Sequence, residues 1–114
     1  LVFSPQGEQV ARYDKIHLFD ADVNDGKPYM ESGTIRPGES ISLVNTGFAR
    51  IGLSICYDLR FPALYQSLRQ HGADLIVVPA AFTVPTGEAH WRTLLRARAI
   101  ENQVYIVAPA QCGT

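Results

Sequence analysis

Apolar residues in the second half of the chain fall into three short runs with the length and texture of β-strands. In residues 49–56 large apolar side chains alternate with small ones such as Gly52 and Ser54. This alternation predicts a strand with one tightly packed face and another face that lets a neighbour come close. Residues 73–78 are almost continuously apolar, which is typical of a strand buried on both faces, and residues 103–108 form another apolar strand.

Two amphipathic stretches separate these runs. Pro62 stands where proline is tolerated, in the first turn of a helix, and the apolar stripe that follows ends at a stop signal, Gly72. Residues 88–101 predict a second helix, with Trp91 among the apolar residues along one side. The order from residue 49 is therefore β-α-β-α-β, which predicts an α/β fold with a parallel or mixed sheet.

The first half of the chain is less regular. Residues 1–3 and 9–13 are β-prone and flank a run of turn residues, so they predict a β-hairpin. Residues 15–19 predict a strand or the exit from one, and residues 41–44 a short strand. Between them, residues 20–40 contain Asp, Asn, Gly and Pro at intervals that break every periodicity. They predict a long irregular loop, and loops of about 20 residues inside compact domains tend to be functional.

Composition and charge exclude several classes of protein. The chain has 114 residues, of which 46% are hydrophobic and 18% charged, and its formal net charge is −1. The apolar content excludes intrinsic disorder, and the near-zero charge offers no footprint for nucleic acid or an anionic membrane. No apolar run approaches the roughly 20 residues of a membrane span. Two cysteines, Cys56 and Cys112, are too few for a disulfide scaffold and fit a cytoplasmic setting.

The two ends of the chain are abrupt. It begins at Leu1 without Met, directly in an apolar stretch whose residues do not predict a secretory leader, and it stops at Thr114 just after another apolar stretch. Because domains ordinarily end in exposed polar tails, we expect residues 1–114 to be an interior part of a longer protein, with both N-terminal and C-terminal parts missing.

Cys56 is the most informative position for chemistry. It follows a predicted buried strand and precedes a predicted helix. A strand-to-helix turn lifts one side chain out of the sheet and points backbone N–H groups at whatever that side chain attacks. Those N–H groups favour both a thiolate and a tetrahedral oxyanion. The alternative for Cys56 taken alone is a small, buried hydrophobic residue.

A thiol nucleophile needs a partner that helps it to lose its proton. Three histidines are present, His17, His71 and His90, and spacing alone selects none of them as a base. No metal-ligand spacing with the cysteines is found either. Lys15 is a second candidate. It faces solvent by default, but near a thiolate it would stabilise anionic intermediates.

These segments together resemble a known family. Residues 12–20 (Arg-Tyr-Asp-Lys-Ile-His-Leu-Phe-Asp), residues 52–62 (Gly-Leu-Ser-Ile-Cys-Tyr-Asp-Leu-Arg-Phe-Pro) and residues 89–91 with 96–101 are similar to the nitrilase superfamily, or carbon–nitrogen hydrolases. Order and spacing agree over essentially the whole chain. The segment from Cys56 to Pro62 and the closing residues 110–113 resemble the Nit branch, which includes deaminated glutathione amidase and ω-amidase.

The resemblance implies a Glu-Lys-Cys mechanism on an amide. Cys56 matches the nucleophile that forms a thioester, and Lys15 matches the lysine that stabilises the tetrahedral intermediate together with the backbone N–H of Tyr57. The family's general base is a glutamate well upstream of the lysine. Glu8, in the predicted hairpin turn, does not match it, so we expect no general-base glutamate in this chain.

Further site residues follow from the same resemblance. Asp22 is the best match for a second acidic residue after the lysine, with Asp20 as its competitor and a solvated loop carboxylate as the alternative for either. Phe82 and Thr86 resemble positions that line the substrate pocket, with a plain loop role as the alternative.

Arg60 has two interpretations. Four residues after Cys56, it is placed to bind a substrate carboxylate with its bidentate fork. The alternative is a structural ion pair with Asp58 or Glu101. Arg98 and Glu101 lie three residues apart and could pair on one helix face. Cys112 is expected to be structural, because no physical argument makes it reactive.

We therefore expect the central part of a nitrilase-type α-β-β-α sandwich that hydrolyses the ω-amide of a small carboxylate. The expected partners are that small-molecule amide and water, with no cofactor or metal, no nucleic acid and no membrane, and with a homodimer in the full-length protein. A non-catalytic fragment or scaffold of the same fold is the alternative. A redox or cofactor-using enzyme is disfavoured, because Cys-x-x-Cys, Gly-x-Gly-x-x-Gly and phosphate-loop motifs are absent. The sequence does not separate amide from nitrile substrates.

Overall fold

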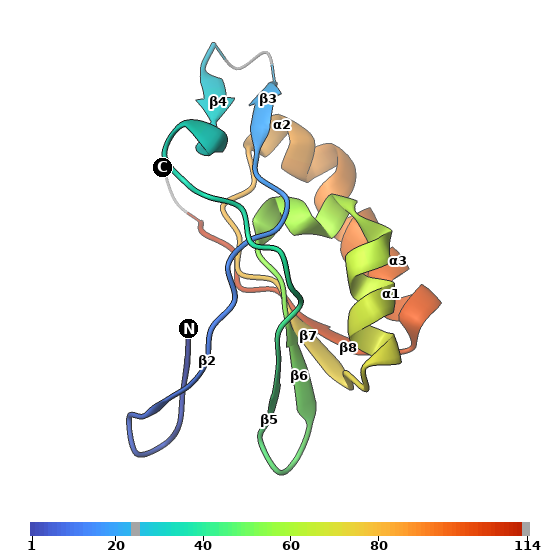
Figure 1. Ribbon diagram of the computed structural model, residues 1–114. Helices are drawn as coiled ribbons and strands as arrows, with labels where there is room; N and C mark the ends of the chain where they lie inside the picture. Colours follow the sequence, from blue (N-terminus) through green and yellow to red (C-terminus); the bar gives the residue numbers. More distant parts are fainter. Residues whose placement is uncertain (24–25, 113–114) are drawn as a thin grey trace.

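A four-stranded mixed sheet forms the centre of the molecule (Figure 1). The computed structural model describes residues 1–23 and 26–112; Asn24 and Asp25 of the expected loop, and Gly113 and Thr114 of the closing segment, lie outside the described residues. The strand order is β5-β6-β7-β8. The four strands are β5 (Leu43–Asn45), β6 (Arg50–Leu53), β7 (Leu75–Val77) and β8 (Tyr105–Val107). β5 runs antiparallel to β6, and β6, β7 and β8 are parallel, which confirms the predicted α/β class.

The register of the sheet explains the small residue in β6. Gly52 pairs with Ile76 and Ile76 with Ile106, so these three form one row on the helix-covered face. A Cβ atom at Gly52 would lie 3.2 Å from the methyl carbons of Leu68 in the helix above. The close approach that the alternation of large and small residues predicted is therefore an approach of a helix.

Two helices cover that face of the sheet (Figure 1). Helix α1 (Pro62–Gln70) buries its apolar stripe and ends before Gly72, which has a φ of 92°. Helix α3 (Arg92–Asn102) is preceded by the short helix α2 (Val84–Thr86) and the π-helical turn η3 (Gly87–Trp91), so the predicted second helix starts as a wider turn. The core between sheet and helices contains Leu59, Leu64, Tyr65, Leu68, Ala73, Ile76, Val78 and Val104.

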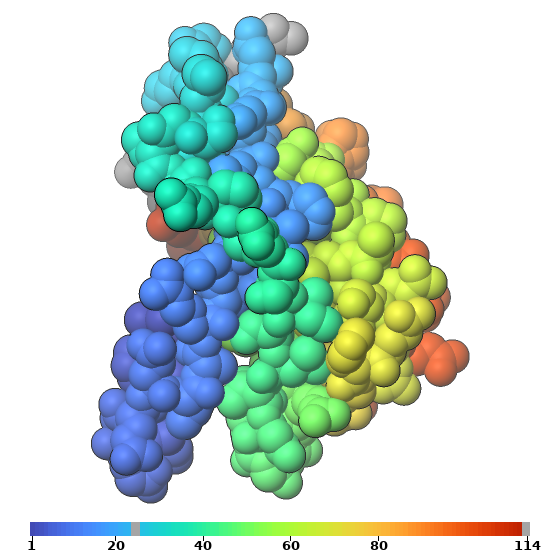
Figure 2. Space-filling model, viewed as in Figure 1, coloured from blue at the N-terminus to red at the C-terminus, as the bar shows by residue number. Residues whose placement is uncertain are grey.

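Two hairpins precede the sheet in the chain. β1 (Val2–Phe3) and β2 (Gln9–Ala11) form the predicted N-terminal hairpin, which projects from the body in Figure 2. β3 (Asp20–Asp22) and β4 (Pro28–Met30) form a second hairpin, continued by the 3-10 turn η1 (Glu31–Gly33).

This second hairpin corrects two expectations. Residues 15–19 form no strand, and residues 20–40 are not irregular throughout. The sequence carried a usable signal, since an Asp-Gly pair between β-capable segments favours a hairpin turn, and Gly26 adopts a φ of 81°.

The described residues supply one half of the expected sandwich, a sheet with one helical layer. A second sheet packed on this one and a second helical layer are not among residues 1–23 and 26–112. In the same residues no helix has the length and apolar character needed to cross a membrane.

Candidate active site

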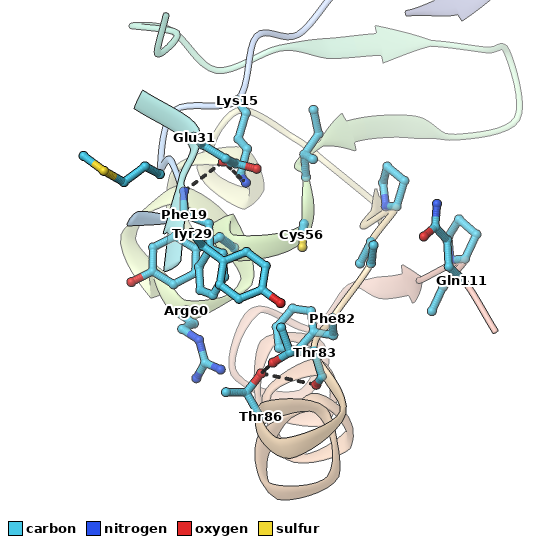
Figure 3. A pocket seen from close by; sticks show the side chains of 18 of the residues that line it. Lys15, Phe19, Tyr29, Glu31, Cys56, Arg60, Phe82, Thr83, Thr86 and Gln111 are labelled. Carbon is cyan, nitrogen blue, oxygen red and sulfur yellow. Dashed lines mark hydrogen bonds and ion pairs between the residues drawn. The ribbon is translucent and has the colours of Figure 1, made fainter. Parts of the chain in front are cut away.

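A cavity of about 850 Å³ opens at the carboxyl ends of the three parallel strands (Figure 3). Cys56 follows β6, Phe82 and its neighbours follow β7, and Gln111 follows β8. Phe19 and residues of the β3–β4 hairpin form another wall of the cavity. Ligands of α/β sheets bind in this position because loops and helix N-termini converge there.

Cys56 occupies a constrained position at the bottom of this cavity. It begins the 3-10 helix η2 (Cys56–Arg60) with a φ of 47°, a left-handed conformation that is uncommon outside glycine. Its N–H donates to the Pro79 carbonyl over 3.0 Å, which anchors the turn to the end of β7. The thiol is free and partly exposed. The turn thus presents the sulfur of Cys56 to the cavity, as the strand-to-helix pattern predicts.

The start of η2 has one backbone donor to spare. The Cys56 N–H is used by Pro79, and the Asp58 N–H donates to the Ile55 carbonyl over 3.0 Å. The Tyr57 N–H between them has no acceptor within residues 1–23 and 26–112. A donor of this kind beside a nucleophile can bind an oxyanion.

Lys15 lines the same cavity and is held by a carboxylate. Its side chain is 7% exposed, and its Nζ lies 2.6 Å from Oε2 of Glu31 (Figure 3). The same oxygen accepts the Phe19 N–H over 2.8 Å. The Phe19 N–H thus holds Glu31 independently of Lys15, and Glu31 in turn positions the Lys15 ammonium.

Glu31 is a residue that sequence reasoning missed. We expected the acidic residue beside the lysine to be Asp22 or, in competition, Asp20. Asp22 pairs with Pro28 in the hairpin and is not among the residues that line the cavity. Asp20 accepts the Ser32 N–H, and hydrogen bonds from the Ser32 side chain and then its backbone lower the pKa of Asp20. Glu31 follows Lys15 by sixteen positions and is brought back by the β3–β4 hairpin.

Arg60 reaches the cavity from the end of η2. Its guanidinium lies 5.4 Å from the centre of the Phe82 ring, and its Nη1 is 3.2 Å from Nδ1 of His90. A guanidinium has donors only, so His90 must present a lone pair here. The alternative partners are engaged elsewhere, since Asp58 binds Tyr13 and His17 and Glu101 pairs with Arg98 at 2.9 Å.

Phe82 and Thr86 both line the cavity. The Phe82 ring packs against Trp91, with 4.7 Å between ring centres. The hydroxyls of Thr83 and Thr86 lie 2.6 Å apart, which closes the turn that carries them. These contacts form a wall whose apolar side rests on Trp91, a partly buried residue that packs against the core.

The remaining candidate ligands are dispersed. His71 contacts the Ser67 carbonyl at the end of α1, and Cys112 is exposed and so fills no place in the core. Among the described residues no three His, Cys, Asp or Glu side chains gather as a metal site would require. Glu8 lies exposed in the turn of the N-terminal hairpin.

Comparison with known proteins identifies the family. The family model for carbon-nitrogen hydrolase matches residues 1–114. The chain is 59% identical over 99% of its length to a deaminated glutathione amidase of Yersinia enterocolitica, and 50% identical over 92% to omega-amidase NIT2 of Homo sapiens. Its fold matches the crystal structure of the C. elegans NitFhit protein with a TM-score of 0.89 and 50% identity, covering 98% of this chain and 27% of that one.

The chain matches only part of the length of its relatives. The chain spans 40% of the length of the Yersinia relative and 38% of the human one. Within that span the family model extends over every residue of the chain, including those around Cys56, Lys15 and the cavity. This chain belongs to the carbon–nitrogen hydrolases of the nitrilase superfamily.

Proposed function

We propose that the whole protein hydrolyses a non-peptide amide, the ω-amide of a small carboxylate, through a thioester on Cys56. The observation that carries this proposal is the shared cavity of Cys56 and Lys15, with the ammonium of Lys15 fixed by Glu31 at 2.6 Å. Named amidases among the relatives support the class of reaction.

The reaction has two halves. The sulfur of Cys56 attacks the amide carbon, and the oxyanion that forms is stabilised by the Tyr57 N–H and the Lys15 ammonium. The C–N bond then breaks, the nitrogen leaves with a proton from the thiol, and the acyl group remains as a thioester. Water attacks the thioester carbon, the C–S bond breaks, and the carboxylate product and the free thiol result.

In the proposed mechanism, the general base belongs to a part of the protein outside residues 1–114. Glu31 is committed to Lys15 and the Phe19 N–H, and Glu8 is exposed in a hairpin turn. We therefore propose that the remainder of the protein supplies the base that takes the thiol proton and later activates water. For this reason the assays below use the whole protein.

The charges in the cavity support a carboxylate substrate. The ammonium of Lys15 is neutralised by Glu31, whereas Arg60 rests against a ring and an imidazole. Its guanidinium is therefore the charge available to an incoming anion, and its planar fork matches a carboxylate. The distal carboxylate of the substrate would bind at Arg60 while its amide lies at Cys56.

The first test is hydrolysis of glutaramate, followed by ammonia release. We expect turnover by the whole protein and a loss of about a thousandfold or more in Cys56→Ala, since removing a covalent nucleophile has effects of this size. Turnover that survives Cys56→Ala would contradict the nucleophile assignment. No turnover of any amide by the unchanged protein would favour the alternative, a non-catalytic protein of the same fold.

The second test separates the carboxylate anchor from general damage. Pentanamide is glutaramate with a methyl group in place of the carboxylate. We expect Arg60→Met to lower kcat/KM for glutaramate by about 10- to 150-fold, the value of a charged hydrogen bond, and to leave kcat/KM for pentanamide nearly unchanged. Arg60→Lys keeps the positive charge but loses the planar guanidinium. Its kcat/KM for glutaramate should therefore lie between the values for the unchanged protein and for Arg60→Met. Equal losses on both amides would exclude the anchor.

A further inference from the structure

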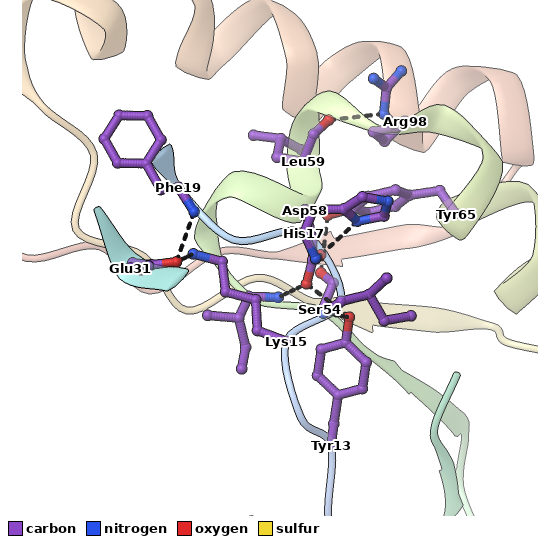
Figure 4. Close-up of polar contacts among 12 residues, drawn as sticks. Tyr13, Lys15, His17, Phe19, Glu31, Ser54, Asp58, Leu59, Tyr65 and Arg98 are labelled. Carbon is purple, nitrogen blue, oxygen red and sulfur yellow. Dashed lines mark hydrogen bonds and ion pairs between the residues drawn. The ribbon is translucent and has the colours of Figure 1, made fainter. Parts of the chain in front are cut away.

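A buried carboxylate joins the segment that carries Lys15 to the turn that carries Cys56 (Figure 4). The side chain of Asp58 is 0% exposed. Its Oδ2 accepts the Tyr13 hydroxyl over 2.8 Å and the Ile55 N–H over 2.9 Å. Its Oδ1 accepts the His17 N–H over 3.0 Å and lies 2.8 Å from Nδ1 of the same residue.

The partners of Asp58 flank the two reactive residues. Tyr13 and His17 stand on either side of Lys15 in the sequence, and Ile55 immediately precedes Cys56. Asp58 itself lies in η2 beyond the nucleophile and is not among the residues that line the cavity. It therefore acts on the reaction through its neighbours, without touching the substrate.

The Lys15 segment, residues 13–17, needs such anchors because it belongs to no helix or strand. Besides its bond to Asp58, its backbone makes two bonds among the described residues: the Ile16 N–H donates to the Tyr13 hydroxyl over 3.2 Å, and the Gly38 N–H donates to the Lys15 carbonyl over 2.9 Å. His17 also stacks on Phe61, with 3.7 Å between ring centres. The first of these bonds depends on a hydroxyl that Asp58 itself orients.

Resting on the proposed function, we propose that Asp58 is a positioning residue that, through Tyr13 and His17, sets the Lys15 ammonium against the Cys56 thiolate. Three partners of the carboxylate are N–H or O–H donors, and Nδ1 of His17 is a fourth in the tautomer that carries its proton there, so a carboxylate satisfies all of them at once. An uncharged amide at this place would turn one acceptor into a donor that faces other donors. Misplacing a catalytic group by about 1 Å can cost about a hundredfold in rate.

A pair of matched tyrosines separates positioning from plain stability. Tyr13 and Tyr65 are both buried, and each donates or shares one side-chain hydrogen bond, Tyr13 with Asp58 and Tyr65 with Ser54 at 2.9 Å. Tyr13→Phe and Tyr65→Phe each delete a single buried hydroxyl. Only the first deletion loosens the Lys15 segment.

The readout is the pH dependence of Cys56 alkylation by iodoacetamide, measured without substrate in the whole protein carrying Cys112→Ser. A nearby cation stabilises a thiolate, so Lys15→Met defines the upward shift of the alkylation midpoint when the ammonium is lost. We expect Tyr13→Phe to give at least half of that shift and to lower kcat on glutaramate about 10- to 100-fold with little change in KM. Tyr65→Phe should leave the alkylation midpoint within about 0.3 pH units, and kcat within about twofold, of the values for the unchanged protein.

A second variant shows whether the effect of Tyr13→Phe comes from misfolding. His17→Phe keeps the stack on Phe61 and the backbone N–H to Asp58, while it removes the Nδ1 contact. It should shift the midpoint in the same direction as Tyr13→Phe. Folded Tyr13→Phe and His17→Phe proteins with unshifted midpoints would overturn the proposal, and so would an unshifted Lys15→Met, because there would be no ammonium–thiolate pair to position. A protein that hydrolyses no ω-amide but shows these shifts would refute the proposed substrate class alone.

Discussion

At the scale of single residues, the polar groups of the interior each have an assigned partner. Lys15, Ser54, Asp58, Arg98 and Asn102 are the buried polar or charged residues of the described chain. Arg98, for example, donates to the Leu59 carbonyl over 3.1 Å and pairs with Glu101, as the spacing of three residues predicts. Buried side-chain N and O atoms without a hydrogen-bond partner are absent from residues 1–23 and 26–112. Such complete satisfaction makes each of these bonds expensive to break.

The two buried tyrosines predict a weakness at alkaline pH. Burial, followed by the hydrogen bond to Asp58, raises the pKa of Tyr13, and burial raises the pKa of Tyr65. Above about pH 10 the unfolded chain loses these protons while the folded chain keeps them. Because the unfolded state then binds fewer protons, the free energy of unfolding should fall by about 1.4 kcal/mol per pH unit for each tyrosine, and it should be unaffected below that range.

Urea unfolding of the whole protein between about pH 9 and 11 measures this slope. Tyr65→Phe removes one titrating group, so the free energy of unfolding of this variant should fall less steeply with pH than that of the unchanged protein. Parallel declines for the two proteins would show that Tyr65 does not contribute.

At the scale of elements, the segment between η1 and β5 holds the Lys15 segment in place. The Gly38 N–H donates to the Lys15 carbonyl over 2.9 Å, and a Cβ at Gly38 would collide with the backbone carbonyl oxygen of Asp14. Glycine is needed here for close approach of two chains, because no side chain fits between them. Gly33, in η1, has no atom within 4 Å of the corresponding point.

The two glycines predict opposite responses to the same change. Gly38→Ala should destabilise the protein by about 1–3 kcal/mol, as overpacking does, and should slow Cys56 alkylation by moving Lys15. Gly33→Ala should stay within about 0.5 kcal/mol of the unchanged protein. Thermal unfolding and alkylation rates measure both effects. Equal behaviour of the two variants would mean that the segment yields without moving Lys15.

At the scale of the whole molecule, the helices cover one face of the sheet, and the other face is exposed at β8, although Leu53 of β6 on that face is buried. Tyr105 and Val107 of β8 belong to the rows opposite the helices, and their side chains are 78% and 49% exposed. β8 is also the last strand in the order of the described sheet. An apolar face next to an unpaired strand edge favours association.

We therefore predict that residues 1–114, prepared alone, self-associate or are poorly soluble. Sedimentation velocity should show species larger than a monomer, and a double substitution Tyr105→Lys, Val107→Lys should reduce them. Ile100→Lys is the control, since Ile100 is 76% exposed but lies on α3, and it should not reduce association. A monomer that unfolds cooperatively would prove the prediction wrong. The homodimer expected for the full-length protein stays a separate prediction.

Local patterns determined much of this protein. The β-α-β-α-β order, the buried stripe of α1 and the close approach at Gly52 in β6 could be predicted because strand and helix periodicities are written in neighbouring residues. The same holds for Cys56, because a strand followed by a Pro-initiated helix defines the turn between them. Phe82 and Thr86 were expected at the substrate pocket, and both line the cavity.

Only the tertiary structure decided which polar groups surround Lys15 and Asp58. Glu31 reaches Lys15 across a hairpin, and Asp58 reaches Tyr13 over 45 positions. Neither contact can be predicted from sequence periodicity, because the course of an irregular segment is set by long-range bonds rather than by its own residues. For the same reason Asp22, close to Lys15 in sequence, is absent from the cavity that Glu31 lines. The sequence by itself determined the strands and helices of the central sheet and the turn that carries Cys56, and packing across distant segments determined the surroundings of the lysine.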